Sequence, residues 1–450
     1  MKRRHFVALA SLAGAMLPAV TLAATPCPPP DISVSGGTSV TTACDDGQDD
    51  GPPGSAPSWF LNLPDATWSA IAVDGTISKV LPSPIPDAHG GDRPGAITDA
   101  WTGAAVDQNR GEYIVAANGG HADYPGNEAY ALSLRSANPA WRRITDPTPN
   151  GSLGDVSTTG NGRYADGRPR AMHSTFEVFG DGRVWFPLQN SVTSNDGGTI
   201  NGMVAFNRDL LGSASSPLPW TASNLGPWEI HAQPQPSGMW LGTVIFGVAA
   251  FDPVGHKVWA LGGNSTNYTL YWSVDTTGSS LGKVTRYQQD QPFGHWGGWV
   301  AIAPELRVMV AGDHLKKVAT VLDLNNPGTW KQISNVSGAG YFGQGSGGVY
   351  IAANRTIAVG HPKAIGRTIH TLQIPTKVVN GATVYDPAGQ WVWGTRNPGG
   401  PTFSMPSGGN NDSYSKWNIV QDMGNGQSAI VVLTDINTGT YVYKVPRAGI

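Results

Sequence analysis

Charged residues and cysteine are both scarce in this sequence, and neither sign of charge is in large excess. Asp, Glu, Lys and Arg make up 14% of the 450 residues, and the formal net charge is −3. This balance gives no reason to expect nucleic acid or an anionic membrane surface as a partner. The two cysteines are Cys27 and Cys44, so a site built from the rest of the chain has none.

The sequence also offers no apolar run suited to a membrane anchor. The N-terminal run, at residues 7–22, is short and is interrupted by Pro18. It follows the paired arginines Arg3 and Arg4 and ends in small residues, which is typical of a twin-arginine export signal. Residues 1–24 are therefore predicted to be a signal peptide. The mature chain is predicted to be periplasmic or extracellular, without a membrane span.

Residues 25–57 are predicted to be a disordered linker, because Pro, Gly, Ser, Thr and Asp dominate them. Cys27 and Cys44 flank much of this segment. In a chain bound for an oxidising compartment, we expect these two residues to form a local disulfide. The remaining residues, 58–450, are predicted to form one domain.

What the sequence does have is abundant glycine, proline and tryptophan, with 59, 35 and 16 residues. Such a composition indicates many short strands joined by tight turns. Residues 114–134 show the pattern most clearly. An apolar run ends at Gly119 and Gly120, a polar turn follows, and residues 129–134 alternate as a half-buried strand does.

This pattern of strand, turn and strand recurs along the chain, each time followed by a third strand. Its six copies occupy residues 102–120, 174–190, 247–264, 299–313, 348–361 and 418–435. Outer segments with an aromatic residue follow at 141–144, 220–221, 286–287, 330–333 and 390–393. The sixth copy has none, so the N-terminal segment 66–71 is expected to complete it. The sequence therefore predicts an all-β, six-bladed β-propeller closed by an N-terminal strand, or seven blades if an insert hides a degenerate one.

The Gly-Gly pairs after second strands, at 119–120 and 262–263, and the aromatic outer strands resemble kelch repeats. The ring is similar to the propeller domain of galactose-oxidase-like proteins, from about residue 60 to residue 447. This resemblance implies a kelch-type fold and does not by itself imply a function. The radical-copper chemistry of those relatives needs a cysteine crosslinked to a tyrosine. That cofactor is not expected here, because no cysteine follows residue 44.

Antiparallel order within a blade sorts residues between the two faces of the ring. Residues just before or at the start of first strands and residues just after second strands lie on one face, which we call the inlet face. The turns between first and second strands lie on the opposite face, which we call the turn face. This rule places five histidines on the inlet face: His121, His173, His295, His314 and His361. It sends His256, Asp107 and Arg307 to the turn face, where ordinary solvated charge is expected.

The inlet face carries the groups needed to cleave a uronate-containing glycan by β-elimination. That reaction needs a base, an acid for the leaving oxygen, and cations near the substrate carboxylate. The predicted catalytic residues are His173, His121, Tyr124, His295 and Tyr341. The predicted substrate-binding residues are Arg168, Arg170, Trp296, His314, Lys316, His361, Lys363 and Trp417. The favoured function is an exported polysaccharide lyase whose partner is an acidic polysaccharide or oligosaccharide.

Other functions stay open at this point. Aromatic side chains on one face are also typical of a propeller that binds glycans without chemistry. A divalent metal such as zinc, copper or manganese is a further possibility, with candidate ligands His121, Asp123, His173, His295, His314 and His361. Hydrolysis by paired carboxylates fits less well, because the inlet face offers only Asp123, Glu128, Asp313 and Asp412.

Overall fold

The structure is a computed structural model of the chain. It describes residues 55–87, 93–98, 102–120, 124–153, 163–187, 189–191, 203–211, 224–231, 248–263, 269–287, 298–314, 316–343, 345–360, 367–403 and 414–450. The side chains of residues 151–152, 172–175, 189–191, 263, 269–270 and 414 lie outside this description. The predicted signal peptide, Cys27, Cys44 and nearly all of the predicted linker also lie outside the described residues.

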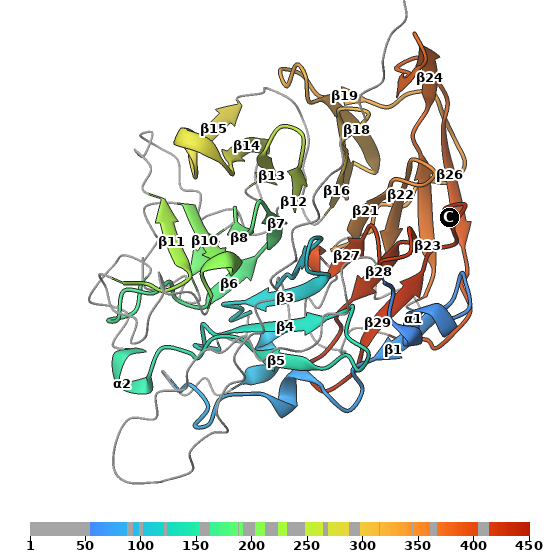
Figure 1. The fold of residues 1–450 in the computed structure, drawn as a ribbon. Coiled ribbons are helices and arrows are strands. Elements are labelled where there is room, and N and C mark those ends of the chain that lie inside the picture. Colours follow the sequence, from blue (N-terminus) through green and yellow to red (C-terminus); the bar gives the residue numbers. More distant parts are fainter. Residues whose placement is uncertain are drawn as a thin grey trace, which may run out of the picture.

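Six sheets of the described chain follow one another around a central axis (Figure 1). Their innermost strands are β2 (Ala105–Asp107), β7 (Val178–Gly180), β12 (Val248–Asp252), β16 (Trp299–Ala303), β21 (Gly347–Ile351) and β27 (Trp417–Val420). Each of these strands contacts the next, and β27 contacts β2, so the circle is closed. The predicted all-β, six-bladed propeller is confirmed. The assignment of its repeats to the kelch type stays a prediction.

Second and third strands pair antiparallel outward from the innermost strands. The second strands are β3 (Glu112–Ala116), β8 (Arg183–Phe186), β13 (Lys257–Gly263), β17 (Val308–Asp313), β22 (Thr356–Gly360) and β28 (Ala429–Val432). The third strands are β4 (Ala129–Ser133), β10 (Met203–Asn207), β14 (Thr269–Asp275), β18 (Val318–Asp323), β23 (Ile369–Gln373) and β29 (Thr440–Lys444). The six copies of the repeat therefore correspond to the six blades.

A fourth strand pairs outside the third strand in each blade. These strands are β5 (Trp141–Arg143), β11 (Trp228–His231), β15 (Val284–Tyr287), β19 (Lys331–Gln332), β26 (Trp391–Arg396) and β1 (Trp68–Ile71). The second blade differs from the expectation, because its outer strand is β11 and not residues 220–221, which lie outside the described residues. In the sixth blade, β1 pairs antiparallel with β29, with Trp68 opposite Tyr443.

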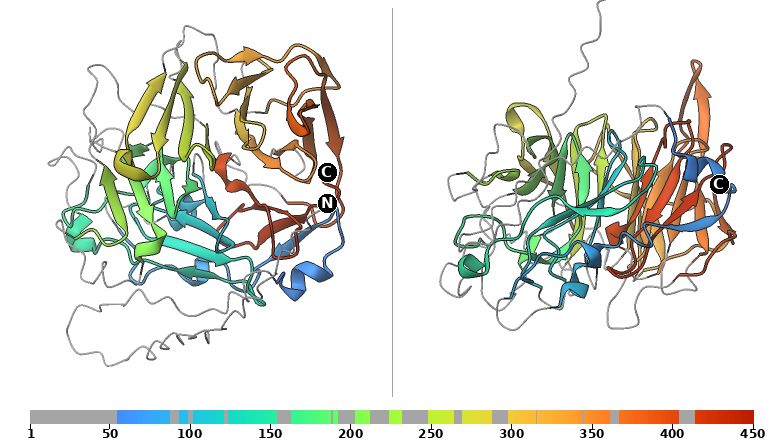
Figure 2. Two further views of the ribbon diagram at one scale, coloured as in Figure 1. Left: turned by 45° about the horizontal axis from the view of Figure 1, so that its top comes forward. Right: turned by 60° about the horizontal axis from the view of Figure 1, so that its bottom comes forward.

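Three smaller additions extend the blades. β6 (Met172–Thr175) pairs with β9 (Gln189–Ser191) beyond the inlet ends of β7 and β8. β20 (Val336–Ser337) adds a parallel edge to β26. The hairpin of β24 (Thr376–Val379) and β25 (Ala382–Tyr385) projects from the fifth blade (Figures 1 and 2).

Helices in the described residues are short. They are α1 (Ser58–Asn62), α2 (Asn150–Leu153) and the 3₁₀ turns η1 (Ile77–Lys79), η2 (Pro94–Ile97), η4 (Arg208–Leu210), η6 (Gly278–Ser280) and η7 (Tyr414–Lys416). None of the helices in this part of the chain has the length and apolar character needed to cross a membrane.

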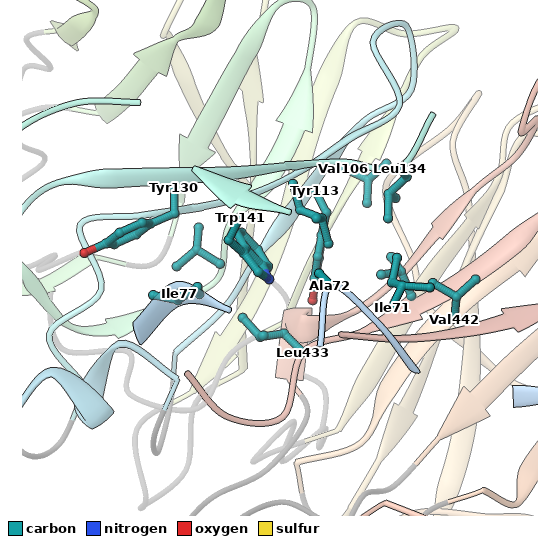
Figure 3. Close-up of a cluster of buried hydrophobic side chains, with 14 of the residues drawn as sticks. Ile71, Ala72, Ile77, Val106, Tyr113, Tyr130, Leu134, Trp141, Leu433 and Val442 are labelled. Atoms are coloured by element: carbon teal, nitrogen blue, oxygen red, sulfur yellow. The ribbon is translucent and has the colours of Figure 1, made fainter. Parts of the chain in front are cut away.

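Blades pack face to face through buried aromatic and branched side chains, and the junction of the sixth and first blades is one example (Figure 3). Tyr113 and Trp141 of the first blade lie beside Ile71, Leu433 and Val442, and all five are buried. Trp141 Nε1 also donates a hydrogen bond to Thr440 Oγ1 at 3.0 Å. Buried aromatic rings contribute much of the apolar area that stabilises such a junction.

Polar side chains on the turn face also join neighbouring blades. Arg307 of the fourth blade donates two hydrogen bonds to Asp252 of the third, at 2.6 and 2.9 Å. His256 Nδ1 of the third blade lies 3.0 Å from Asp181 Oδ2 of the second. Asp107 and Asp252 are 0% and 1% exposed. The expectation of ordinary solvated charge does not hold for Asp107, which Arg110 and two backbone N–H groups of its own turn bind, or for Arg307, which binds the buried Asp252 of the neighbouring blade. The His256 side chain is 54% exposed, as expected.

Candidate functional site

One cavity follows the propeller axis along the innermost strands. Its volume is about 470 Å³, and all six innermost strands contribute to its wall. Small-molecule sites commonly have volumes of roughly 300–1,000 Å³. Glu177, Ser346 and Ser415 line the inlet end, and Asp181 and Gln421 line the turn end. The cavity therefore reaches from one face of the ring towards the other.

The middle of the cavity wall is apolar. Its strands contribute small and branched side chains there, including Val106, Ala249, Ala250, Val300, Ala301 and Val349. Among the described residues that line the cavity, Glu177 and Asp181 carry the only carboxyl groups, and none is Lys, Arg or His.

Glu177 is the buried carboxyl at the inlet end. It directly precedes β7 and is 1% exposed. Its Oε2 accepts a hydrogen bond from the Ala116 backbone N–H at 3.2 Å, and its Oε1 has no hydrogen-bond partner in the described part of the chain. Burial raises the pKa of the Glu177 carboxyl well above its ordinary value, although the Ala116 N–H, Asn118 and the Lys416 charge act in the opposite direction. This carboxyl therefore keeps its proton to a higher pH than an exposed glutamate does.

Ser415 and Lys416, which precede β27, bring the sixth blade to the same end of the cavity. Ser415 Oγ accepts a hydrogen bond from the Glu177 backbone N–H at 3.2 Å. Lys416 is fully buried, and its Nζ donates to Thr98 O at 2.7 Å and to Thr102 Oγ1 at 3.2 Å. The ammonium therefore acts on Glu177 through its charge while its hydrogen bonds go to the loop before β2.

The two tyrosines predicted to be catalytic lie away from the cavity wall. Tyr124 is fully buried, and its hydroxyl donates to Glu128 Oε1 at 2.6 Å. Tyr130 donates to the same oxygen at 2.7 Å. Burial raises the pKa of both the Glu128 carboxyl and the Tyr124 hydroxyl. The Tyr341 ring stacks on His370, with centroids 3.9 Å apart. Each tyrosine thus has a partner within the fold, and its catalytic role stays a prediction.

Arg168 and Arg170 are turned into the protein, and each is 4% exposed. Arg168 Nε donates to Asp166 Oδ2 at 2.8 Å, and its Nη1 donates to Asp146 O at 2.7 Å. Arg170 Nε donates to Arg163 O at 3.0 Å, and its guanidinium lies 5.7 Å from the centre of a neighbouring tyrosine ring. These contacts stabilise the loop that precedes β6, and neither guanidinium lines the cavity.

His314, Lys316 and Trp417 are the other predicted residues whose side chains are described. His314 Nδ1 lies 3.1 Å from Phe342 O, and Lys316 is exposed. Trp417 is 4% exposed and packs edge-on against Trp68, with ring centroids 5.6 Å apart. Of the predicted site residues with described side chains, only Trp417 lines the cavity.

Most of the predicted histidines fall outside the description. His121, Asp123, His295, Trp296, His361 and Lys363 are not among the described residues. The backbone of His173 lies in β6, on the inlet side of the second blade, and its side chain is outside the description. Within the described residues, no three His, Cys, Asp or Glu side chains form a group that could hold a metal ion. His314 is the only metal candidate whose side chain is described.

Glu177 is the residue that sequence reasoning missed. It stands between Phe176 and Val178, at the point where the chain enters an innermost strand. The rule that places His173 on the inlet face places Glu177 there as well. The signal in the sequence is a lone carboxyl among apolar residues where the chain enters an innermost strand, because ionisation is unfavourable in apolar surroundings.

Comparisons with known proteins show a similarity in architecture only. No protein-family model matches the chain, and no curated protein matches it. Among solved structures, it is similar to an alpha-L-arabinanase of Penicillium chrysogenum, with 9% identity, a TM-score of 0.41, and coverage of 85% of this chain and 99% of that one. It is also similar to YjhT, with 12% identity, a TM-score of 0.40, and coverage of 77% and 99%. A gluconolactonase of Xanthomonas campestris gives 9% identity, a TM-score of 0.38, and coverage of 88% and 98%. Similarity at this level identifies neither a substrate nor a reaction.

Proposed function

We propose that this protein is a carbohydrate-active enzyme, a polysaccharide lyase that cleaves a uronate-containing glycan at the inlet end of the axial cavity. The observation that carries the proposal is Glu177. Its carboxyl is buried, lines the cavity and has a raised pKa. A carboxyl that keeps its proton to a higher pH than an exposed glutamate does is suited to act as a general acid.

Glu177 supplies the acid that β-elimination needs. A base removes the proton from the carbon beside the substrate carboxyl group, and that electron pair becomes the new double bond. The bond to the leaving oxygen breaks, and Glu177 gives its proton to that oxygen. We assign the base to His173, whose backbone lies four residues before Glu177, in β6 on the inlet side. Glu177 replaces Tyr124 and Tyr341 in this scheme, because the Tyr124 hydroxyl is bonded to Glu128 and the Tyr341 ring stacks on His370.

Hydrolysis is the second candidate, since a carboxyl with a raised pKa is also the acid of many glycosidases. Such an enzyme needs a second carboxylate across the glycosidic bond. Among the described residues that line the cavity, the other carboxyl is Asp181, which lies at the opposite end and is paired with His256. This arrangement favours elimination.

The product distinguishes the two reactions. The purified mature chain is incubated with a panel of uronate-containing polymers, and both ultraviolet absorbance and new reducing ends are measured. A lyase releases unsaturated ends that absorb in the ultraviolet, one for each new reducing end. Glu177→Gln should lower the rate by about 100-fold or more, because it removes the acid. Reducing ends without absorbance would show hydrolysis, and saturable binding without any product would show a binding protein.

A further inference from the structure

The charge of the cavity wall restricts the substrate that can be bound. Its described part contains Glu177 at the inlet end, Asp181 at the turn end, and apolar or uncharged residues between them. A free carboxylate entering this space would lose water and meet no cation of the described wall. An unpaired charge in such a place is strongly unfavourable.

The described cations near the inlet end do not supply a positive charge to the cavity wall. The guanidinium groups of Arg168 and Arg170 are held by Asp166 and by backbone carbonyls. Lys416 directs its ammonium to Thr98 and Thr102. None of these three side chains lines the cavity.

We infer that the substrate presents an uncharged uronate ester, such as a methyl ester, to the inlet end of the cavity and not a free carboxylate. This inference rests on the proposed function and specifies its substrate class. An ester carries no charge to compensate, so the apolar strands around the axis can accept its alkyl group. An ester also withdraws electrons more strongly than a carboxylate does, so the neighbouring proton is easier to remove. Elimination from an ester therefore develops less negative charge than elimination from a carboxylate, so it needs less stabilisation by cations.

Two polymers with one backbone test the inference: polygalacturonate with high and with low methyl esterification. Initial rates are followed by ultraviolet absorbance, and binding of matched oligomers is followed by calorimetry. We expect the rate or the affinity to favour the ester by roughly tenfold or more, the equivalent of one good hydrogen bond or ion pair. Binding that favours the ester without any product would refute the lyase and support this inference. Equal values, a preference for the free acid, or no binding of either polymer would overturn it.

A cation placed in the wall gives the reciprocal test. Ala249 lines the cavity from β12 and is partly exposed to it, so Ala249→Lys adds an ammonium to the wall. This variant should lose the preference for the ester and gain affinity for the free acid. Val254→Lys is the control, because Val254 is 58% exposed in the turn that follows the same strand. Thermal melting establishes that both variants fold. If Ala249→Lys does not fold, the comparison of the two polymers with the native chain still decides the question.

Discussion

Replacing Glu177 with Gln should make the folded protein more stable at neutral pH while removing the proton donor. The substitution keeps the size of the side chain and retains an oxygen that can accept the hydrogen bond from the Ala116 N–H. The other oxygen, Oε1, has no partner in the described residues, so an amide nitrogen in its place breaks no described hydrogen bond. The main change is that the group no longer titrates.

Glu177→Gln is expected to stabilise the protein because the pKa of Glu177 is raised in the folded state. In the unfolded chain the carboxyl has its ordinary pKa of 4.5, so folding at pH 7 requires it to take up a proton or to bury a charge. Taking up the proton at pH 7 costs about 3 kcal/mol, which is an upper limit on the gain for Glu177→Gln. The gain should be close to zero below pH 4.5, where both states are protonated. It should grow as the pH rises from there towards the pKa of the folded state.

Urea unfolding of both proteins at about pH 4, 6 and 7.5 measures this difference. Glu229→Gln is the matched control with the opposite sign. Hydrogen bonds to His231, Arg183 and Asn207 lower the pKa of Glu229 to about 2, so its ionised form stabilises the fold above pH 4.5. Glu229→Gln should therefore destabilise the protein at neutral pH, and this loss should shrink as the pH falls from 4.5 towards 2. A Glu177→Gln effect that is constant across this range, or a destabilisation that grows with pH, would refute the assignment of a buried, protonated carboxyl.

The remaining predictions concern the two faces of the ring and an ion pair of the projecting hairpin. His173→Ala should lower the rate of product release without lowering the melting temperature. His256→Asn should leave the rate unchanged, because His256 lies in a turn at a φ of 49° that asparagine also tolerates; equal loss of activity in both variants would contradict the assignment of the faces. Arg307→Ala should cost about 3–5 kcal/mol of unfolding free energy, because it leaves the buried Asp252 carboxylate without its guanidinium. Lys377→Ala removes one partner of an exposed pair and should change stability by less than about 1 kcal/mol, as urea unfolding can measure.

The fold was predictable from the sequence because a propeller repeats one pattern, and each copy supports the interpretation of the others. The second, third and innermost strands follow directly from apolar runs separated by turns that contain Gly or Asp. The outer strand of the second blade was placed wrongly, because outer strands are less buried and their pattern is weaker. Trp228 of β11 and Trp220 are both aromatic residues that could mark that strand.

The site was less predictable, because side-chain direction and pairing depend on contacts that the repeat does not specify. Arg168 and Arg170 were expected to meet a substrate, but Asp166 and two backbone carbonyls take up their hydrogen bonds. Glu177 was overlooked since nothing in its local sequence shows that blades one and six enclose it. The pKa shift of this residue arises from burial by segments far away in the chain, so it becomes visible only in the folded structure.

The two faces of the ring therefore differ in their polar groups: the inlet face holds a buried carboxyl, and the turn face holds ion pairs between blades. Keeping a carboxyl buried at the inlet end lowers stability at neutral pH, and a closed ring must recover that loss elsewhere. On the turn face, Asp252 with Arg307 and Asp181 with His256 join successive blades at the far ends of the innermost strands. These contacts join the second, third and fourth blades at the turn face, whereas Glu177 lies at the inlet end of the second blade. Weakening a turn-face contact should therefore lower stability, whereas the reaction at the inlet face should be retained for as long as the ring stays folded.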